Sequence, residues 1–134
     1  MAAPEIYVLF PGCAREALTR YGEIFGSEVV LNTYAEFGRD DGPGEAIAHG
    51  GIRGPVTLSG ADAAPGEAPV RMEGMMITLL GAEAPGVLHD WFDALAEGGT
   101  VIEPLQTRPW GDTDGQVRDA YGLVWLIGYE GSMR

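Results

Sequence analysis

The sequence of 134 residues contains one order of elements twice, and this repetition limits the possible folds more than any other feature. In the first half, an apolar stretch at 6–10 precedes an apolar stripe with helical spacing at 14–25, and Gly26 ends that stripe. In the second half, an apolar stretch at 75–80 precedes another helical stripe, which ends at Gly98. Gly26 and Gly98 are 72 residues apart, or about half the chain. The sequence therefore predicts an internal duplication.

Each predicted helix is followed by three short segments with the composition of strands. The segments are 28–34, 46–53 and 56–59 in the first half, and 100–102, 115–119 and 123–129 in the second. A linker rich in Pro, Ala and Gly occupies 60–71. We therefore expect a single domain, 1–134, in which two βαβββ modules, 5–59 and 72–130, are joined by this linker.

One module alone would leave one face of its sheet uncovered. Two such sheets placed edge to edge would form a curved mixed sheet around a cleft, with the helices outside. The last strand supports this arrangement, because Trp125 and Ile127 alternate with Val124 and Leu126, so that both faces of the strand are apolar. A strand buried on both faces belongs in the interior of a layered structure. The predicted fold class is α+β, and the cleft should be mostly apolar, as small-molecule sites usually are.

The formal net charge of -12 excludes several kinds of partner. Such a chain would repel nucleic-acid phosphates and anionic lipids. It would suit a cationic small ligand, although solubility alone also accounts for an acidic surface. No apolar run approaches the roughly 20 residues of a membrane span, and no basic stretch precedes the first apolar residues, so we expect a cytoplasmic protein. The single Cys13 excludes an internal disulfide and a zinc site built on cysteines.

Three segments carry a family resemblance: REALTRYGEIFGSEV, AIAHGGIR and WGDTDGQVRDAYGLVWLI. They resemble the PhnB-like branch of the vicinal oxygen chelate superfamily, which contains glyoxalase I, fosfomycin and bleomycin resistance proteins, and extradiol dioxygenases. The resemblance implies the paired βαβββ fold of that superfamily, and commonly a homodimer. Some members are labelled demethylubiquinone methyltransferases, but no GxGxxG segment follows a predicted strand here, so we discount that activity.

The resemblance also implies where a metal would be bound. Metal-dependent members take one ligand from the first strand of each module and one from the last strand. Here the first strand offers Tyr7, Val8 and Leu9, the strand after the linker offers Met75, Met76 and Ile77, and Leu126 stands where the last ligand is expected. Apolar side chains at such positions do not coordinate a divalent cation, so we expect no metal and no other cofactor. The alternative is a divalent metal held by His49 together with a carboxylate. The candidate carboxylates are Glu5, Glu73 and Glu130.

His49 is the strongest chemical candidate, because it matches the histidine of the A-H pair that the resemblance implies and because imidazole exchanges protons near neutral pH. The alternative is a structural histidine that bonds a backbone group or braces a dimer contact. His89 is predicted to be a solvated surface residue. Trp110 either covers a ligand with its aromatic face or closes the end of the barrel. The expected ligand-binding residues are Tyr7, His49, Met76, Trp110 and Leu126, and no catalytic residue is assigned.

Three functions remain open at this stage. The first is a metal-free binding protein that sequesters a small molecule, cationic and aromatic, in the cleft. The second is a metal-dependent lyase or isomerase of glyoxalase type. The third is an interaction module whose cleft binds no ligand.

Overall fold

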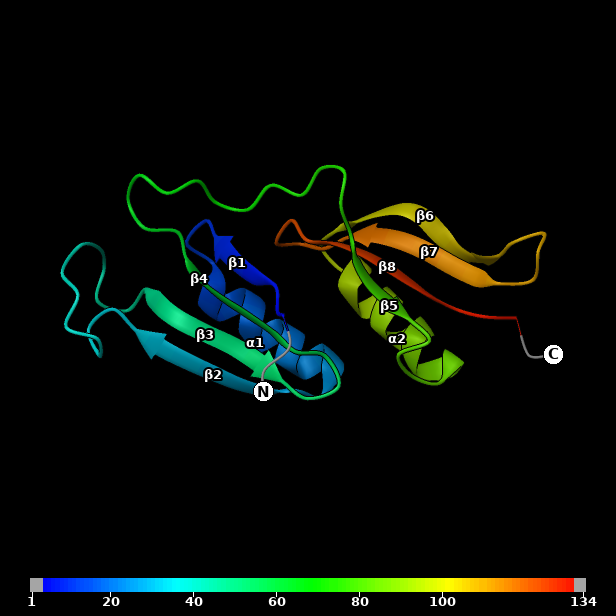
Figure 1. Ribbon diagram of the computed structural model, residues 1–134, viewed down its shortest axis with the longest axis horizontal. Helices are drawn as coiled ribbons and strands as arrows, with labels where there is room; N and C mark the ends of the chain where they lie inside the picture. The colour runs from blue at the N-terminus through cyan, green and yellow to red at the C-terminus, as the bar shows by residue number, and fades with distance from the viewer. Residues whose placement is uncertain (1–3, 132–134) are drawn as a thin grey trace. The chain divides into compact units, whose positions relative to one another are not determined.

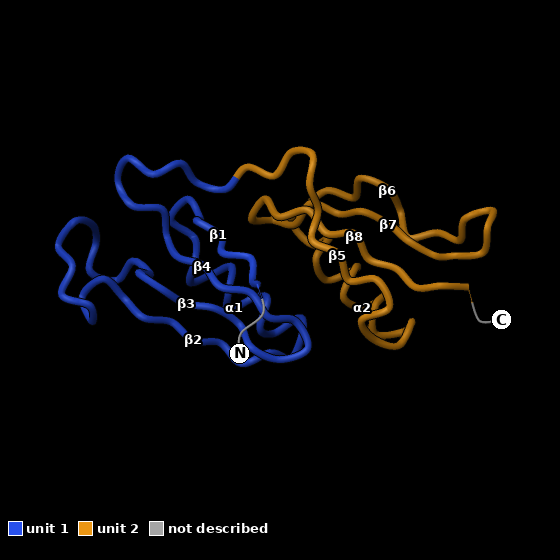
Figure 2. Tube along the Cα trace, viewed as in Figure 1, with its two compact units in different colours: residues 1–70 blue, residues 71–134 orange. Residues whose placement is uncertain are grey.

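The computed structural model describes residues 4–131. The chain divides into two compact units, residues 1–70 and residues 71–134 (Figure 2). Each unit contains a four-stranded mixed sheet and one helix (Figure 1), which confirms the predicted α+β fold and the repeated order of strand, helix and three strands. That the two sheets enclose a common cleft stays a prediction. Among the described residues, no helix has the length and apolar character needed to cross a membrane.

Unit 1 contains five elements. They are β1 (Tyr7–Phe10), α1 (Ala14–Phe25), β2 (Glu28–Thr33), β3 (Ile47–Arg53) and β4 (Leu58–Asp62). The strands lie in the order β1-β4-β3-β2. β1 runs parallel to β4, whereas β3 is antiparallel to both of its neighbours.

Unit 2 repeats this topology. Its elements are β5 (Ile77–Leu80), α2 (Pro85–Ala96), β6 (Thr100–Thr107), β7 (Thr113–Arg118) and β8 (Val124–Tyr129). The strand order is β5-β8-β7-β6, with β5 parallel to β8 and the other pairs antiparallel. β8 therefore lies between β5 and β7 in its sheet, whereas the covering of both its faces in a layered structure stays a prediction.

α1 forms where the apolar spacing places it, and it packs its buried stripe on one face of the sheet of unit 1. Leu18, Tyr21 and Phe25 on this stripe are almost fully buried. Gly26 ends the helix with a left-handed backbone, φ 67°, and its N–H donates to the carbonyl of Gly22. The predicted end of this helix is confirmed.

The first turn of α1 is held by a side chain from β4 rather than by its own N-cap. Cys13, the N-cap residue, makes no capping hydrogen bond through its side chain. Instead the buried Asp62 accepts hydrogen bonds from the backbone N–H of Ala14, at 2.9 Å, and of Ile47, at 2.8 Å. A helix start otherwise leaves such N–H groups unpaired, so Asp62 fixes α1 and the start of β3 relative to β4.

The other face of each sheet carries no helix of its own unit, and we call it the open face. In β1, Val8 and Phe10 are buried, whereas Tyr7 is 50% exposed, so Tyr7 lies on the open face. In β8, Ile127 is fully buried and Leu126 is only partly buried, which places Leu126 on the open face of unit 2. Cross-strand partners share a face, so the pairing registers give the rest of each open face.

The largest differences from the predicted strand boundaries are in β4 and β6. β4 runs from Leu58 to Asp62, so that the first residues of the predicted linker belong to the strand and are buried between β1 and β3. β6 extends to Thr107 although it contains Pro104. An edge strand tolerates proline, and β6 pairs with β7 through two register shifts, which fall between Val101 and Glu103 and between Glu103 and Gln106.

Candidate functional site

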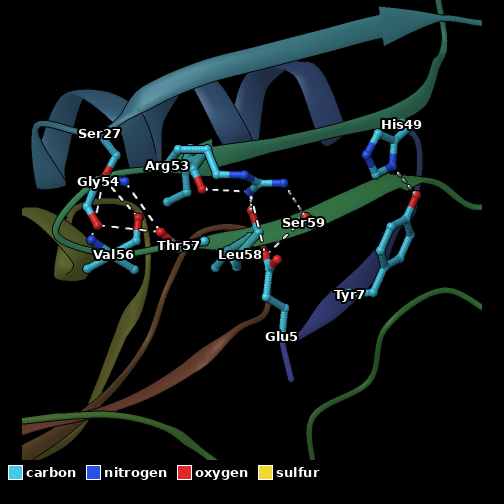
Figure 3. Close-up of polar contacts among 11 residues, drawn as sticks. Glu5, Tyr7, Ser27, His49, Arg53, Gly54, Val56, Thr57, Leu58 and Ser59 are labelled. Atoms are coloured by element: carbon cyan, nitrogen blue, oxygen red, sulfur yellow. Dashed lines mark hydrogen bonds and ion pairs between the residues drawn. The ribbon is translucent and has the colours of Figure 1, made fainter. Parts of the chain in front are cut away.

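Tyr7 and His49, two of the predicted site residues, contact each other on the open face of unit 1. The Tyr7 hydroxyl lies 3.0 Å from Nδ1 of His49, and the two rings stack with their centroids 5.6 Å apart and their planes 20° apart. Figure 3 shows the two side chains turned toward each other from β1 and β3. The structure therefore places His49 in a side-chain hydrogen bond and not in a backbone bond, whereas a dimer contact of His49 stays a prediction.

The pair meets across β4 because the residues beneath it are small. In the register of the sheet, Ser59 of β4 is the partner of Tyr7 on one side and of Gly51 on the other. The same register pairs Leu9 of β1 with Ala61, the other residue of β4 on this face. No large side chain of β4 stands between the two rings, so the phenol can reach the imidazole.

A second polar group lies on the same face. Arg53 donates from Nη2 to Oγ of Ser59 at 2.9 Å, and from Nη1 to the carbonyl of Leu58 at 3.1 Å. Glu5 Oε1 accepts from Ser59 Oγ at 3.3 Å and lies 3.6 Å from Nη1 of Arg53 (Figure 3). The Arg53 guanidinium passes over Gly51, since Nη1 lies 2.7 Å from the position that a Cβ there would occupy. The sequence alone did not predict that Glu5, Ser59 and Arg53 form a group.

The segment after β4 brings a carboxylate toward Tyr7. Ala63 and Val70 donate backbone hydrogen bonds to carbonyls of β1, so this segment follows that edge strand. Glu67 Oε1 accepts the N–H of Ala64 at 2.8 Å, which orients its side chain. Partial burial raises the pKa of the Tyr7 phenol, and the negative charge of Glu67 raises it further. Tyr7 therefore keeps its hydroxyl proton at neutral pH.

The open face of unit 2 is apolar at one edge and ionic at the other. Leu126 pairs in register with Thr78 of β5 and with Gln116 of β7, and Met76, 37% exposed, directly precedes β5. Arg108 donates from Nε to Oδ1 of Asp114 at 2.8 Å, and its Nη2 lies 3.8 Å from Oε1 of Glu103. This ion cluster was not predicted from the sequence, because its members come together only when β6 pairs with β7.

Trp110 lies in the turn between β6 and β7 and is 66% exposed. Backbone hydrogen bonds from Arg108 N to Asp112 O and from Gly111 N to Arg108 O close this turn. The indole therefore projects at the tip of a hairpin within unit 2, and its proposed contact with a ligand stays a prediction.

His89 is exposed, as predicted, but it is not simply solvated. Its Nε2 lies 2.8 Å from the hydroxyl of Tyr129, the last residue of β8. Each unit thus contains one Tyr–His pair. The pair in unit 1 joins two strands, whereas the pair in unit 2 joins a helix to a strand, so the two are not equivalent positions of the duplication.

A cleft of about 420 Å³ opens at the ends of β5 and β8 in unit 2. Its lining residues are Leu80, Gly81, Asp112, Thr113, Asp114, Tyr129 and Glu130. None of the five predicted site residues lines it.

The closing sequence motif, which carried much of the resemblance, holds unit 2 together. Asp119 is 5% exposed and accepts hydrogen bonds from the N–H of Tyr121 at 2.8 Å and of Leu123 at 3.1 Å through Oδ1. Its Oδ2 accepts from Nε1 of Trp125 at 2.8 Å. These residues fix the turn before β8 and anchor it to the core, so this part of the motif has a structural role.

Several donor atoms for the alternative metal site are already engaged, whereas Nε2 of His49 has no hydrogen-bond partner among the described residues. Nδ1 of His49 is paired with Tyr7, Glu5 with Arg53 and Ser59, and Glu73 with Arg71 at 3.3 Å. Within residues 4–131, no three His, Cys, Asp or Glu side chains form a group that could hold a metal ion. Leu126, which stands where the resemblance implies a carboxylate ligand, has no donor atom for a divalent cation.

Comparison with known proteins at the sequence level gives no assignment. No protein-family model matches the chain. No curated protein is significantly similar to it.

Solved structures, in contrast, resemble the chain over nearly its whole length. A protein from Pseudomonas aeruginosa is 27% identical, with a TM-score of 0.79 over 97% of this chain and 98% of that one. A PhnB protein from Bacillus cereus, described as a putative 3-demethylubiquinone-9 3-methyltransferase, is 22% identical, with a TM-score of 0.81 over 96% and 99%. A member of the glyoxalase/bleomycin resistance protein/dioxygenase superfamily from Sphaerobacter thermophilus is 19% identical, with a TM-score of 0.57 over 97% and 99%. The chain therefore has the fold of the glyoxalase/bleomycin resistance/dioxygenase superfamily, and a PhnB protein is among its structural neighbours.

Proposed function

We propose that the chain is a PhnB-like, metal-free small-molecule-binding protein of the glyoxalase/bleomycin resistance superfamily. Its ligand contacts the open face of unit 1. The observation that carries this proposal is the stacked and hydrogen-bonded pair of Tyr7 and His49 on that face.

The open face of unit 1 has the composition of a ligand site. Such sites combine apolar walls with a few fixed polar groups. Here the half-exposed phenol ring of Tyr7 supplies a flat apolar surface, and His49 and Ser59 supply polar groups whose positions are set by hydrogen bonds. The small side chain of Ala61 lies beside them on the same face, whereas the guanidinium of Arg53 occupies the position above Gly51.

The charge of the protein favours an aromatic cation as the ligand. The net charge of -12 attracts cations from solution, and Glu67 adds a negative charge close to Tyr7. A cationic ring over a phenol gains about 0.5 to 2 kcal/mol from the cation–π interaction.

The absence of a resident metal is part of the proposal. It is supported by the apolar Leu126 on the open face of unit 2 and by the existing partners of His49 and Glu5. A lyase or isomerase of glyoxalase type would require these side chains to exchange their present partners for a cation.

Ligand binding is tested with two planar aromatic cations, berberine and rhodamine 6G, by isothermal titration calorimetry. We expect at least one of them to bind the wild type, and Tyr7→Phe to weaken that binding about tenfold, which corresponds to the loss of one hydrogen-bonding group. The matched control is Tyr129→Phe, which removes the hydroxyl of the other Tyr–His pair. Equal weakening by both variants, or binding by neither cation, would refute the proposal.

The metal question is tested separately by elemental analysis. The protein is incubated with Zn²⁺, Mn²⁺, Ni²⁺ or Fe²⁺ and then desalted, and we expect less than stoichiometric retention of each. Stoichiometric retention that is lost in His49→Ala but kept in His89→Ala would establish the metal-dependent alternative instead.

A further inference from the structure

The two nitrogens of His49 have different environments. Nδ1 faces the Tyr7 hydroxyl at 3.0 Å, and the close-up shows the ring turned so that its other nitrogen points away from Tyr7 (Figure 3). No described residue forms a hydrogen bond with that second nitrogen, Nε2. The imidazole is partly exposed, and Nε2 belongs to a face that no helix of unit 1 covers.

The direction of the hydrogen bond between Tyr7 and His49 decides which nitrogen of a neutral His49 carries hydrogen, because a protonated phenol either donates to Nδ1 or accepts from Nδ1–H. A hydrogen bond needs one donor and one acceptor, and a neutral imidazole has one of each. The phenol keeps its proton at neutral pH, because partial burial and the charge of Glu67 raise its pKa. When the phenol donates to Nδ1, that nitrogen is the acceptor, and the proton of the ring lies on Nε2.

We propose that the Tyr7 phenol donates to Nδ1 and that His49 presents Nε2–H to the ligand as a hydrogen-bond donor, so that the open face of unit 1 selects small molecules with a carbonyl oxygen beside their aromatic part. This inference rests on the proposed function and adds the class of ligand group that His49 contacts. In this state Nε2 does not act as a general base toward the ligand, because it already carries a proton.

The surroundings of His49 agree with an acceptor oxygen. Arg53 lies on the same strand and the same face as His49, four residues further along the chain. Ser59 and Leu58 accept hydrogen bonds from its guanidinium and hold it in place. The side chain of Glu5 turns toward Arg53 rather than toward His49. Its carboxylate is therefore held away from Nε2, where it would compete with a ligand oxygen.

The protonation state is tested by ¹⁵N nuclear magnetic resonance of the histidine side chains, at a pH where imidazole is neutral. The chain has only two histidines, so His89 serves as an internal reference. We expect the Nε2 of His49 to carry the proton and its Nδ1 to show the signal of a hydrogen-bond acceptor. Neutral imidazole in water already favours the proton on Nε2, so the wild-type spectrum alone does not decide the question. The deciding result is the effect of Tyr7→Phe. We expect this variant to move the Nδ1 signal of His49 toward that of an unbonded nitrogen and to leave the signals of His89 unchanged.

The ligand class is tested on the same spectra with benzamide and benzylammonium, which share a ring and a similar size. We expect benzamide, which has a carbonyl oxygen, to move the Nε2 signal of His49 several times further than benzylammonium, which has only donors. A proton on Nδ1, no response to Tyr7→Phe, or the absence of a preference for benzamide would each overturn this inference. These outcomes leave the calorimetric result with berberine and rhodamine 6G unaffected, so the two proposals fail separately.

Discussion

The indole Nε1 of Trp125 donates a hydrogen bond of 2.8 Å to Oδ2 of Asp119, and this bond ties the turn before β8 to the core of unit 2. Both residues are almost fully buried. The same carboxylate also holds the backbone N–H groups of Tyr121 and Leu123. These residues of the closing motif therefore stabilise the fold and do not serve to bind a ligand.

We accordingly expect Asp119→Ala to lower the free energy of unfolding by about 2 to 4 kcal/mol, because it leaves three donors without their acceptor. Urea denaturation followed by tryptophan fluorescence measures this change. Asp93→Asn, on the exposed side of α2, is the control and should change stability by no more than about 0.5 kcal/mol. If the two variants were equally stable, Asp119 would not have the role described here.

Two helical glycines should respond in opposite directions to replacement by alanine. A Cβ on Gly22 of α1 would overlap Cγ2 of Val29, so Gly22→Ala should destabilise the protein by about 1 to 3 kcal/mol in spite of the better helix propensity of alanine. A Cβ on Gly86 of α2 has nothing within 4 Å, so Gly86→Ala should be neutral or should stabilise by up to about 1 kcal/mol. Thermal unfolding of the two variants gives the comparison. A stabilising Gly22→Ala would show that α1 is not packed against β2 as described.

The Tyr7 phenol should ionise above pH 10.0, the ordinary pKa of tyrosine, because burial and the charge of Glu67 both disfavour the phenolate. Because the pKa of Tyr7 is higher in the folded than in the unfolded protein, its protonated phenol stabilises the folded state. This contribution is complete at pH values below the pKa of the unfolded state. That contribution is lost as the pH rises through the folded pKa of Tyr7. Ultraviolet absorbance of phenolate measures the titration, and the difference between wild type and Tyr7→Phe isolates this residue.

The variant Glu67→Gln separates the two causes of the raised pKa of Tyr7. It removes the smaller of the two causes, so the pKa of Tyr7 should fall only part of the way toward its ordinary value. A complete return would mean that the charge of Glu67, and not burial, dominates. A difference titration at or below pH 10.0 in the wild type would show that burial and Glu67 do not raise the pKa of Tyr7.

The elements that depend on local pattern were predictable from the sequence. The stripe that contains Leu18 and Tyr21, followed by Gly26, specifies α1 and its end, because helical spacing and a left-handed glycine act within a few residues. The apolar stretch at 123–129 likewise specifies the strand β8 itself.

The features that depend on pairing between distant segments were not predictable in this way. Gly60 and Asp62 have the composition of a linker, but they are buried strand residues because β4 pairs with β1 and β3. The contact between Tyr7 and His49 depends on the same two pairings, so the sequence could suggest each residue but not their hydrogen bond. His89 likewise meets Tyr129 only through the packing of α2 on β8.

The central claim is that the open face of unit 1 binds a small molecule through Tyr7 and His49. The most direct test is a fragment screen by two-dimensional amide nuclear magnetic resonance on the full chain. We predict that fragments which bind will move the amide signals of β1, β3 and β4 around these two residues, and that the double variant Tyr7→Phe/His49→Ala will lose these shifts, whereas Tyr129→Phe/His89→Ala will keep them. Signals that move only in other strands, or shifts that persist in the Tyr7→Phe/His49→Ala variant, would contradict the claim.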